Sequence, residues 1–234
     1  MREAVIVSAA RTPIGKAYRG AYNKTAAPTL ASYSINEAVK RAGIDPAEID
    51  DVVLGCAQQQ GSQALNIGRL AGIAAGLPQT VSGMTIDRQC SSGMMAIATA
   101  SKQIITDNMD VVVAGGVESI SLVQTAEMRL EIDPQVSSNA KYAYMPMIET
   151  ADLVASKYNV TRESQDEYSL QSQLRTAAAQ ESGIFKDEII PTTTTKLVKD
   201  KSTGEITEQE VTLEKDEGNR PETNLEGLST LVPV

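Results

Sequence analysis

The sequence predicts an α/β protein whose first half is built on a mostly parallel mixed sheet and whose second half is an α+β region. Strand-like apolar runs alternate with helix-like segments through the first half, which is the pattern of a parallel sheet covered by helices. The run DVVVAGG at residues 110–116 is apolar without alternation, as in a strand covered on both faces. The alternation ends near residue 119, so we predict domains at residues 1–118 and 119–234.

Strands and helices are expected in turn through the first domain. Short apolar or β-branched runs predict strands at residues 4–8, 51–55, 81–86 and 110–116. Helical composition predicts helices at residues 29–41, 46–49, 66–75 and 90–106. Gly43 suits the end of the first helix, and Pro46 suits the first turn of the second.

The second domain is expected to hold too few strands for a buried sheet of its own. Residues 161–182 predict an amphipathic helix that begins after Thr161 and ends before Gly183. Residues 185–190 are strand-like, and residues 196–216 alternate around a turn at 202–204, which predicts a surface hairpin. Residues 224–231 predict a last helix. We therefore interpret residues 119–234 as a loop domain inserted into the layered fold.

Composition excludes several classes of protein. The net charge of −9 argues against a nucleic-acid partner or an anionic membrane surface. No apolar run approaches the roughly 18 residues that a membrane span needs. Two cysteines cannot form a disulfide scaffold. The N-terminal residues lack the pattern of a secretory signal, so a cytoplasmic protein is expected.

The sequence contains no histidine. This absence excludes a Ser-His-Asp or Cys-His catalytic pair made by this chain alone. It also excludes a zinc or haem site with histidine ligands. No metal site and no permanently bound cofactor are predicted.

Cys90 is the strongest candidate nucleophile. It follows the predicted strand at 81–86 and opens the predicted helix at 90–106. The free N–H groups and partial positive charge of a first helical turn stabilise a thiolate, and they can also hold an oxyanion. The alternative is a buried structural cysteine, which is a common core residue. Cys56, at the end of the strand at 51–55, is expected to be such a core thiol.

Several segments resemble the thiolases, which are acyl-CoA acetyltransferases. TIDRQCSSGMMA at residues 85–96 is similar to the family's active-site stretch, and AARTPIG at 9–15 is similar to its opening. NIGR at 66–69, AGGVES at 114–119 and the segment 147–155 resemble three further motifs in the family's order. The form RQCSSG is closest to the 3-ketoacyl-CoA thiolases of fatty-acid β-oxidation. Asp87 departs from the motif, which usually has Asn, and it would disfavour a thiolate unless it points into a local turn.

The resemblance implies a thiolase-like layered fold and a two-step acyl transfer. Cys90 would attack the keto carbon of a 3-ketoacyl-CoA, acetyl-CoA would leave, and free CoA would then take the acyl group; the reverse reaction is a Claisen condensation. The resemblance also implies that the remaining catalytic groups lie in a C-terminal half. This chain is therefore expected to be a truncated or split N-terminal part, without the strand that completes its sheet.

Substrate and partner expectations also follow from the resemblance. CoA thioesters are the expected ligands. Arg220 aligns with an arginine that lies against the CoA adenine, with Leu228 and Leu231 at the spacing of its apolar pocket, although a solvated arginine is the plain alternative. Met147 would line an acyl channel or simply pack. A homo-oligomer is expected, together with a complementing C-terminal thiolase half.

Other interpretations stay open. The absence of histidine favours a non-catalytic CoA-thioester binder, an assembly subunit or an inactive remnant. A condensing enzyme of the ketoacyl-synthase type is a second alternative, and the AGGVES segment speaks against it. Glu118 in that segment fits an orienting carboxylate, a helix cap or a surface acid. The adjacent Gly115-Gly116 pair fits a tight strand end, because it lacks the spacing of a phosphate-binding loop.

Overall fold

The computed structural model describes residues 2–232 and forms two compact units. Unit 1 comprises the described residues of Met1–Met128 together with Phe185–Gly218, and unit 2 those of Arg129–Ile184 with Asn219–Val234. The contacts thus group residues 119–128 and 185–218 with the first part of the chain. The predicted division into domains at residue 119 stays a prediction. Residues 233 and 234, the last two of the predicted second domain, lie outside the described residues.

Unit 1 is organised around a three-stranded parallel sheet in the order β2-β1-β3. Its strands are β1 (Asp51–Gly55), β2 (Ser82–Ile86) and β3 (Val112–Gly116). Gly55 pairs in register with Ile86 and Gly116, so the carboxyl ends of the strands meet at one edge. This edge carries the loops that hold the candidate site.

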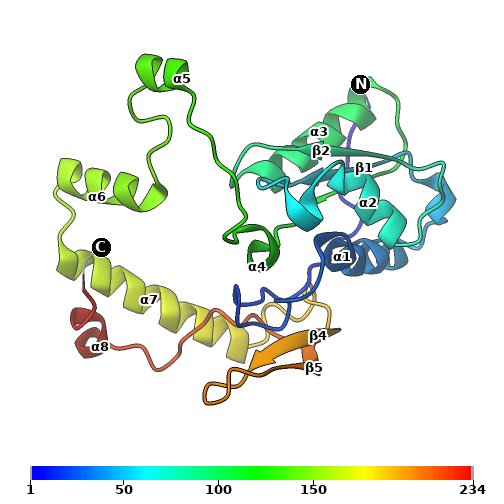
Figure 1. Cartoon of the computed structure of the whole chain (residues 1–234). Coiled ribbons are helices and arrows are strands. Elements are labelled where there is room, and N and C mark those ends of the chain that lie inside the picture. Colours follow the sequence, from blue (N-terminus) through cyan, green and yellow to red (C-terminus); the bar gives the residue numbers. More distant parts are fainter. Residues whose placement is uncertain (1, 233–234) are drawn as a thin grey trace. The chain divides into compact units, whose positions relative to one another are not determined.

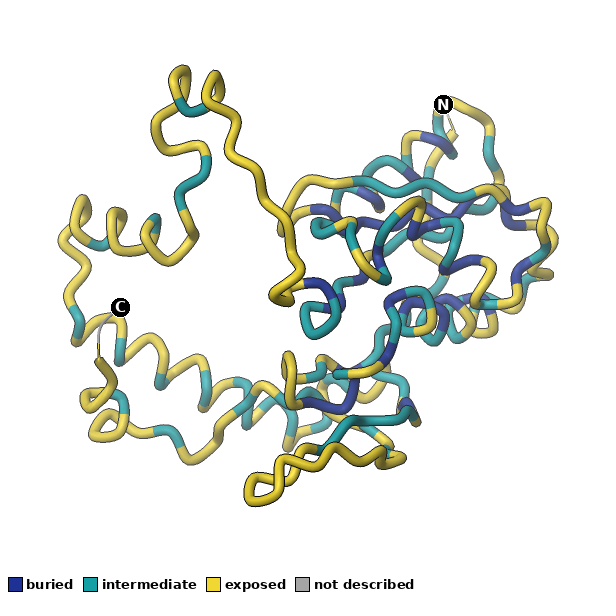
Figure 2. The backbone as a smooth tube through the Cα atoms, in the orientation of Figure 1, coloured by how far each residue is buried: buried dark blue, intermediate teal, exposed yellow. Residues whose placement is uncertain are grey.

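Helices pack against the sheet (Figure 1). The elements of unit 1 outside the sheet are α1 (Ala27–Ala42), η1 (Pro46–Glu48), η2 (Gly61–Gln63), α2 (Ile67–Ala74), α3 (Ser92–Thr106), α4 (Ile120–Val123), β4 (Thr192–Lys199) and β5 (Ile206–Leu213). Val52 and Leu54 belong to a core with α1 and α2. Val53 and Gly55 point to the opposite face of the sheet, because side chains alternate along a strand. Figure 2 shows the buried residues concentrated in these layers.

Local sequence explains how several helices begin and end. Gly43 adopts a left-handed conformation with φ of 67° and caps the end of α1. Asn66 accepts a hydrogen bond from the backbone N–H of Arg69 and so caps the start of α2. Asp45 forms a capping box with Glu48 around η1. These three boundaries agree with the predicted helices within about two residues.

Unit 2 is helical over its described residues. It contains α5 (Pro134–Asn139), α6 (Met147–Tyr158), α7 (Arg162–Glu181) and α8 (Leu225–Ser229). Thr161 accepts a hydrogen bond from the backbone of Ser164, as predicted for the N-cap of the long helix. Arg162 joins α7 to α8, because its Nη2 donates to the carbonyl of Leu228 at 2.6 Å.

Two of the predicted strands are wrong. Residues 4–8 form no strand, and Val5, Ile6 and Val7 are 71%, 80% and 72% exposed. Residues 185–190 are mostly turn, with a single bridge from Ile189 to Arg11. An apolar run expresses a preference for strand, but a strand forms only where a neighbour supplies the hydrogen bonds.

The burial predicted for the run at 110–116 is also wrong. β3 begins at Val112, and its residues are half-buried or exposed. Among the described residues it pairs only with β1, so it is an edge strand. An edge position leaves part of each residue open to solvent.

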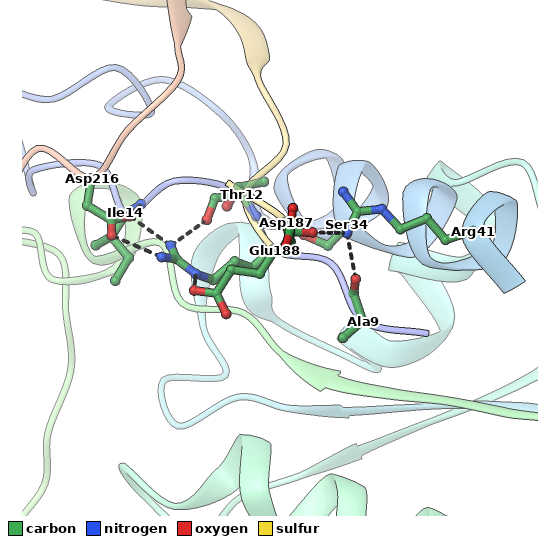
Figure 3. A network of polar contacts seen from close by, with 9 residues as sticks. Ala9, Thr12, Ile14, Ser34, Arg41, Asp187, Glu188 and Asp216 are labelled. Carbon is green, nitrogen blue, oxygen red and sulfur yellow. Dashed lines mark hydrogen bonds and ion pairs between the residues drawn. The ribbon is translucent and has the colours of Figure 1, made fainter. Parts of the chain in front are cut away.

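Arg11 ties the N-terminal segment to the two ends of the β4–β5 hairpin region. Its guanidinium donates to Asp216 at 2.8 and 3.1 Å and to Glu188 at 2.8 Å. Asp216 also accepts from the backbone N–H of Ile14 at 2.7 Å. Figure 3 shows this network, in which Arg41 binds the carbonyls of Ala9 and Asp187. The hairpin therefore belongs to unit 1 although it is far away in sequence.

Replacement of Asp216 tests this tie. Burial raises the pKa of Asp216, but hydrogen bonds from Arg11 and Ile14 offset this, and the pKa lies below its ordinary value. The stabilisation is therefore present above about pH 4 and is lost as the pH falls. We expect Asp216→Asn to lower the free energy of unfolding at pH 7 by about 1–2 kcal/mol, because both partners keep solvent contact.

Urea unfolding of the wild type and the Asn variant across the acid range measures this difference. It should shrink below about pH 4. Lys40→Met is the control, since it removes only an exposed contact to Glu37 within α1. An equal loss of stability in both variants would contradict the assigned role.

Candidate active site

Cys90 lies in a tight turn between β2 and α3. Its side chain is exposed, in contrast to a buried structural cysteine. The prediction that the helix opens at Cys90 is wrong by two residues, because α3 begins at Ser92 with Ser91 as its N-cap. The thiol therefore stands just before the helix, where it is accessible to a ligand.

Hydrogen bonds from neighbouring side chains define the turn. Asp87 accepts from the backbone N–H of Gln89 at 2.7 Å, so its carboxylate serves the turn, which is the alternative that the sequence left open. Ser92 Oγ accepts from the N–H of Arg88 at 2.9 Å and donates to the carbonyl of Gln89 at 2.6 Å. Gln89 has a φ of 48°, which is unusual for a residue with a side chain. Such strain directly before Cys90 is typical of functional turns.

The first turn of α3 follows Cys90 closely in the chain. Ser91 makes no side-chain capping hydrogen bond to the helix. The N–H groups of a first helical turn have no partner within the helix and carry part of the helix dipole. The Ser92 N–H already donates to the carbonyl of Gln89 at 3.0 Å, so the N–H groups of Gly93 and Met94 are those that can stabilise a thiolate or a developing oxyanion.

Two strand-end glycines allow the first turn of α3 to approach the sheet. Gly55 and Gly116 end β1 and β3, and Gly93 lies in the first turn of α3. A Cβ on Gly55 would overlap the backbone of Ser92, and one on Gly116 would lie 3.2 Å from the Cα of Gly93. Gly116 is thus a close-packed strand end, in agreement with the sequence prediction.

A partly buried polar cluster lies two residues beyond the strand-end glycines Gly55 and Gly116. Glu118 accepts from the backbone N–H groups of Ala57 and Gln58 at 2.9 and 3.3 Å and from Gln63 Nε2. Gln63 is fully buried. Nothing in the sequence singles out Gln63, because its glutamine-rich surroundings look like an ordinary polar loop.

Cys56 is a core thiol, as expected. It is 1% exposed, and its Sγ accepts from Gln63 Nε2 at 3.3 Å. Burial, reinforced by the charge of Glu118, raises the pKa of Cys56 to about 12. The two cysteines of this chain thus occupy opposite environments.

The residues assigned to CoA lie in unit 2. The backbone N–H of Arg220 donates to Gln173 on α7, and its side chain is exposed. Leu228 lies half-buried on α8, and Leu231 is 58% exposed just after it. Met147 is 75% exposed at the start of α6. Arg220 thus lies beside the middle of α7, whereas Leu228 contacts Arg162 at the start of that helix, and Met147 lies on a different helix.

The described residues form neither a metal-binding cluster nor a membrane-spanning helix. Within residues 2–232, no three histidine, cysteine or acidic side chains cluster in a way that would hold a metal ion. In the same part of the chain, no helix is both long and apolar enough to cross a membrane.

Replacement of the strand-end glycine tests the packing beneath Cys90. We expect Gly55→Ala to lower the free energy of unfolding by at least about 3 kcal/mol, because backbone atoms of Ser92 cannot move aside. Gly115→Ala is the matched control in β3, where the new Cβ meets only Leu54 Cδ2 at 3.8 Å. Thermal unfolding of both variants measures the difference, and similar melting temperatures would refute the close approach.

Alkylation compares the two thiols in one sample. We expect iodoacetamide at pH 8 to modify Cys90 at least about 100-fold faster than Cys56, because almost no Cys56 thiolate exists below its raised pKa. Peptide mass spectrometry measures both rates, and labelling in denaturant should make them equal. Equally slow labelling of both thiols in the native protein would contradict the prediction that Cys90 is an activated nucleophile.

Comparisons with known proteins agree with the resemblance and the layered fold predicted from the sequence. Residues 4–234 match the family described as thiolase, N-terminal domain. A 3-ketoacyl-CoA thiolase of Bacillus subtilis is 41% identical, and a beta-ketoadipyl-CoA thiolase of Pseudomonas aeruginosa is 37% identical; each match covers all of this chain and 60% of the relative. The crystal structure of the Bacillus anthracis acetyl-CoA acetyltransferase superposes with a TM-score of 0.82 at 39% identity, over 100% of this chain and 59% of that one. The chain thus spans about three-fifths of the length of these relatives, and it belongs to the thiolase family.

Proposed function

We propose that this chain supplies the nucleophile of an acyltransferase that cleaves 3-ketoacyl-CoA thioesters. The observation that carries the proposal is the exposed Cys90 on a strained turn, next to a helix N-terminus without a side-chain cap. Membership of the thiolase family supports the reaction class. The names of several relatives, which are 3-ketoacyl-CoA thiolases, support the substrate class.

The proposed reaction has two steps. Cys90 Sγ bonds to the keto carbon, and the bond between that carbon and the adjacent methylene breaks. The departing acetyl-CoA must gain a proton at its new methyl group. In the second step a CoA thiol must lose its proton as it displaces the acyl group from sulfur. The same steps in reverse form a carbon–carbon bond.

These proton transfers need a group that this chain does not offer. The sequence has no histidine, and Cys56 is buried with its pKa raised to about 12. General acids and bases work best when their pKa lies near the working pH. Turnover therefore requires a complementing C-terminal thiolase portion that brings the acid and base.

CoA recognition is proposed for unit 2. The exposed guanidinium of Arg220 can stack on an adenine face, because guanidinium groups are attracted to aromatic rings. Leu228 and Leu231 offer apolar surface close to it in sequence, and Met147 offers a flexible apolar side chain for the acyl group. A homo-oligomer in the cytoplasm, acting in fatty-acid β-oxidation, is the proposed setting.

A non-catalytic CoA-thioester binder is the second candidate. The absence of histidine favours it directly. In that case Cys90 would lie near a bound CoA thioester but would not accept its acyl group.

Acylation and turnover separate the two candidates. With acetoacetyl-CoA alone, we expect acetyl transfer to Cys90 to be slow and thiolysis to be negligible, because the acid–base group is missing. Addition of a C-terminal thiolase half should restore thiolysis in the wild type but not in Cys90→Ser. Intact-mass spectrometry and loss of the substrate's absorbance measure the two steps, with Cys56→Ser as the control. Robust turnover by the chain alone would overturn this account. If Cys90 is not acylated either with or without the C-terminal half, the result would favour a non-catalytic CoA-thioester binder.

A further inference from the structure

We infer that Glu118 is a positioning residue for Cys90. It acts through the ends of β1 and β3, which support the first turn of α3. The inference rests on the proposed role of Cys90 as nucleophile. The contacts of Glu118 favour an orienting carboxylate over the helix cap and the surface acid that the sequence also allows.

The carboxylate of Glu118 holds the loop that follows β1. It accepts from Ala57 N at 2.9 Å, from Gln58 N at 3.3 Å and from Gln63 Nε2. Three N–H donors therefore converge on two oxygen atoms. A carboxylate can accept all of them, whereas a glutamine side chain would turn its own NH₂ against at least one donor.

Gln63 also links the segment after β1 to the segment after β3. Its Oε1 accepts from the backbone N–H of Ser119, and its Nε2 also donates to the carbonyl of Gln58 at 2.8 Å. Because Gln63 is fully buried, a lost partner would leave a polar group without compensation. The segments after β1 and β3 are thus joined in both directions.

These two segments begin at the glycines on which α3 rests. Gly55 lies against Ser92, and Gly116 lies against Gly93. Ser92 in turn holds the Cys90 turn through Arg88 and Gln89. A shift of the strand ends would therefore move both the first-turn N–H groups and the sulfur.

Asp50 offers a matched control at the other end of the same strands. Its Oδ2 accepts from the backbone N–H groups of Asp110 and Val111 at 2.7 and 3.1 Å. It therefore joins the segments that precede β1 and β3, away from the edge that carries Cys90. Both carboxylates tie β1 to β3 through backbone N–H groups, and only Glu118 does so beneath the candidate site.

The test measures iodoacetamide alkylation of Cys90 in the full chain from roughly pH 6 to 10, for the wild type, Glu118→Gln and Asp50→Asn. We expect Glu118→Gln to slow alkylation at pH 7 by about 10-fold and to move the midpoint of the profile to higher pH, because misaligned N–H groups stabilise the thiolate less. Asp50→Asn should stay within about 2-fold of the wild type. Asp87 and Arg88, which flank Cys90, are unchanged in every variant.

The direction of the shift separates positioning from charge. Loss of a negative charge alone would favour the thiolate and move the midpoint to lower pH. A lower midpoint, or equal effects of Glu118→Gln and Asp50→Asn, would overturn the inference. Wild-type Cys90 that reacts no faster than free glutathione would instead refute the proposed nucleophile, so the two failures are distinguishable.

Circular dichroism and thermal unfolding report whether each variant is folded, because Cys56 itself contacts both Glu118 and Gln63 and cannot serve as an independent reporter. If Glu118→Gln is unfolded, the milder Gln63→Met takes its place. It cuts the link to Ser119 but leaves Glu118 with its two backbone donors. We expect about 3-fold slower alkylation of Cys90 in this variant. A folded Gln63→Met protein with the wild-type profile would refute the positioning role.

Discussion

The close approach of the first turn of α3 to the carboxyl ends of β1 and β3 is the constraint on which the rest of the site depends. Backbone lies directly on backbone there: a Cβ on Gly55 would overlap Ser92, and one on Gly116 would crowd the Cα of Gly93 at 3.2 Å. The parallel arrangement brings both strand ends to one edge, so the turn before the helix emerges where the loops meet. A single packing arrangement therefore sets the position of Cys90 and the direction of the N–H groups beside it.

The polar groups beneath this contact show how a small parallel sheet is fixed at both ends. Asp50 joins the starts of β1 and β3, and Glu118 with Gln63 joins the segments beyond their ends. The two thiols differ in their burial. Cys56 is buried at the end of β1, where burial raises its pKa and favours the neutral thiol, whereas Cys90 is exposed in the turn before α3 and is open to ligands.

Much of the fold could be predicted, because local signals and tertiary contacts agree in the interior of unit 1. The strand at Asp51–Gly55 and the left-handed Gly43 after α1 follow from an apolar run and a helix-stop residue. The failures share one cause. Residues 4–8 have the composition of a buried strand but no strand neighbour among the described residues, and no periodicity within a segment reports what lies beside it.

The sequence by itself determined the α/β class, the family motifs around Cys90 and the absence of an imidazole, because residue types and their order carry that information. Only the tertiary structure decided that Cys90 is exposed and stands before the helix, that Asp87 serves the turn, and that Gln63 is buried against Glu118. These features depend on which backbone groups meet across the sheet edge. Residues far apart in sequence become partners there, so their roles arise only when the strands and α3 have packed together.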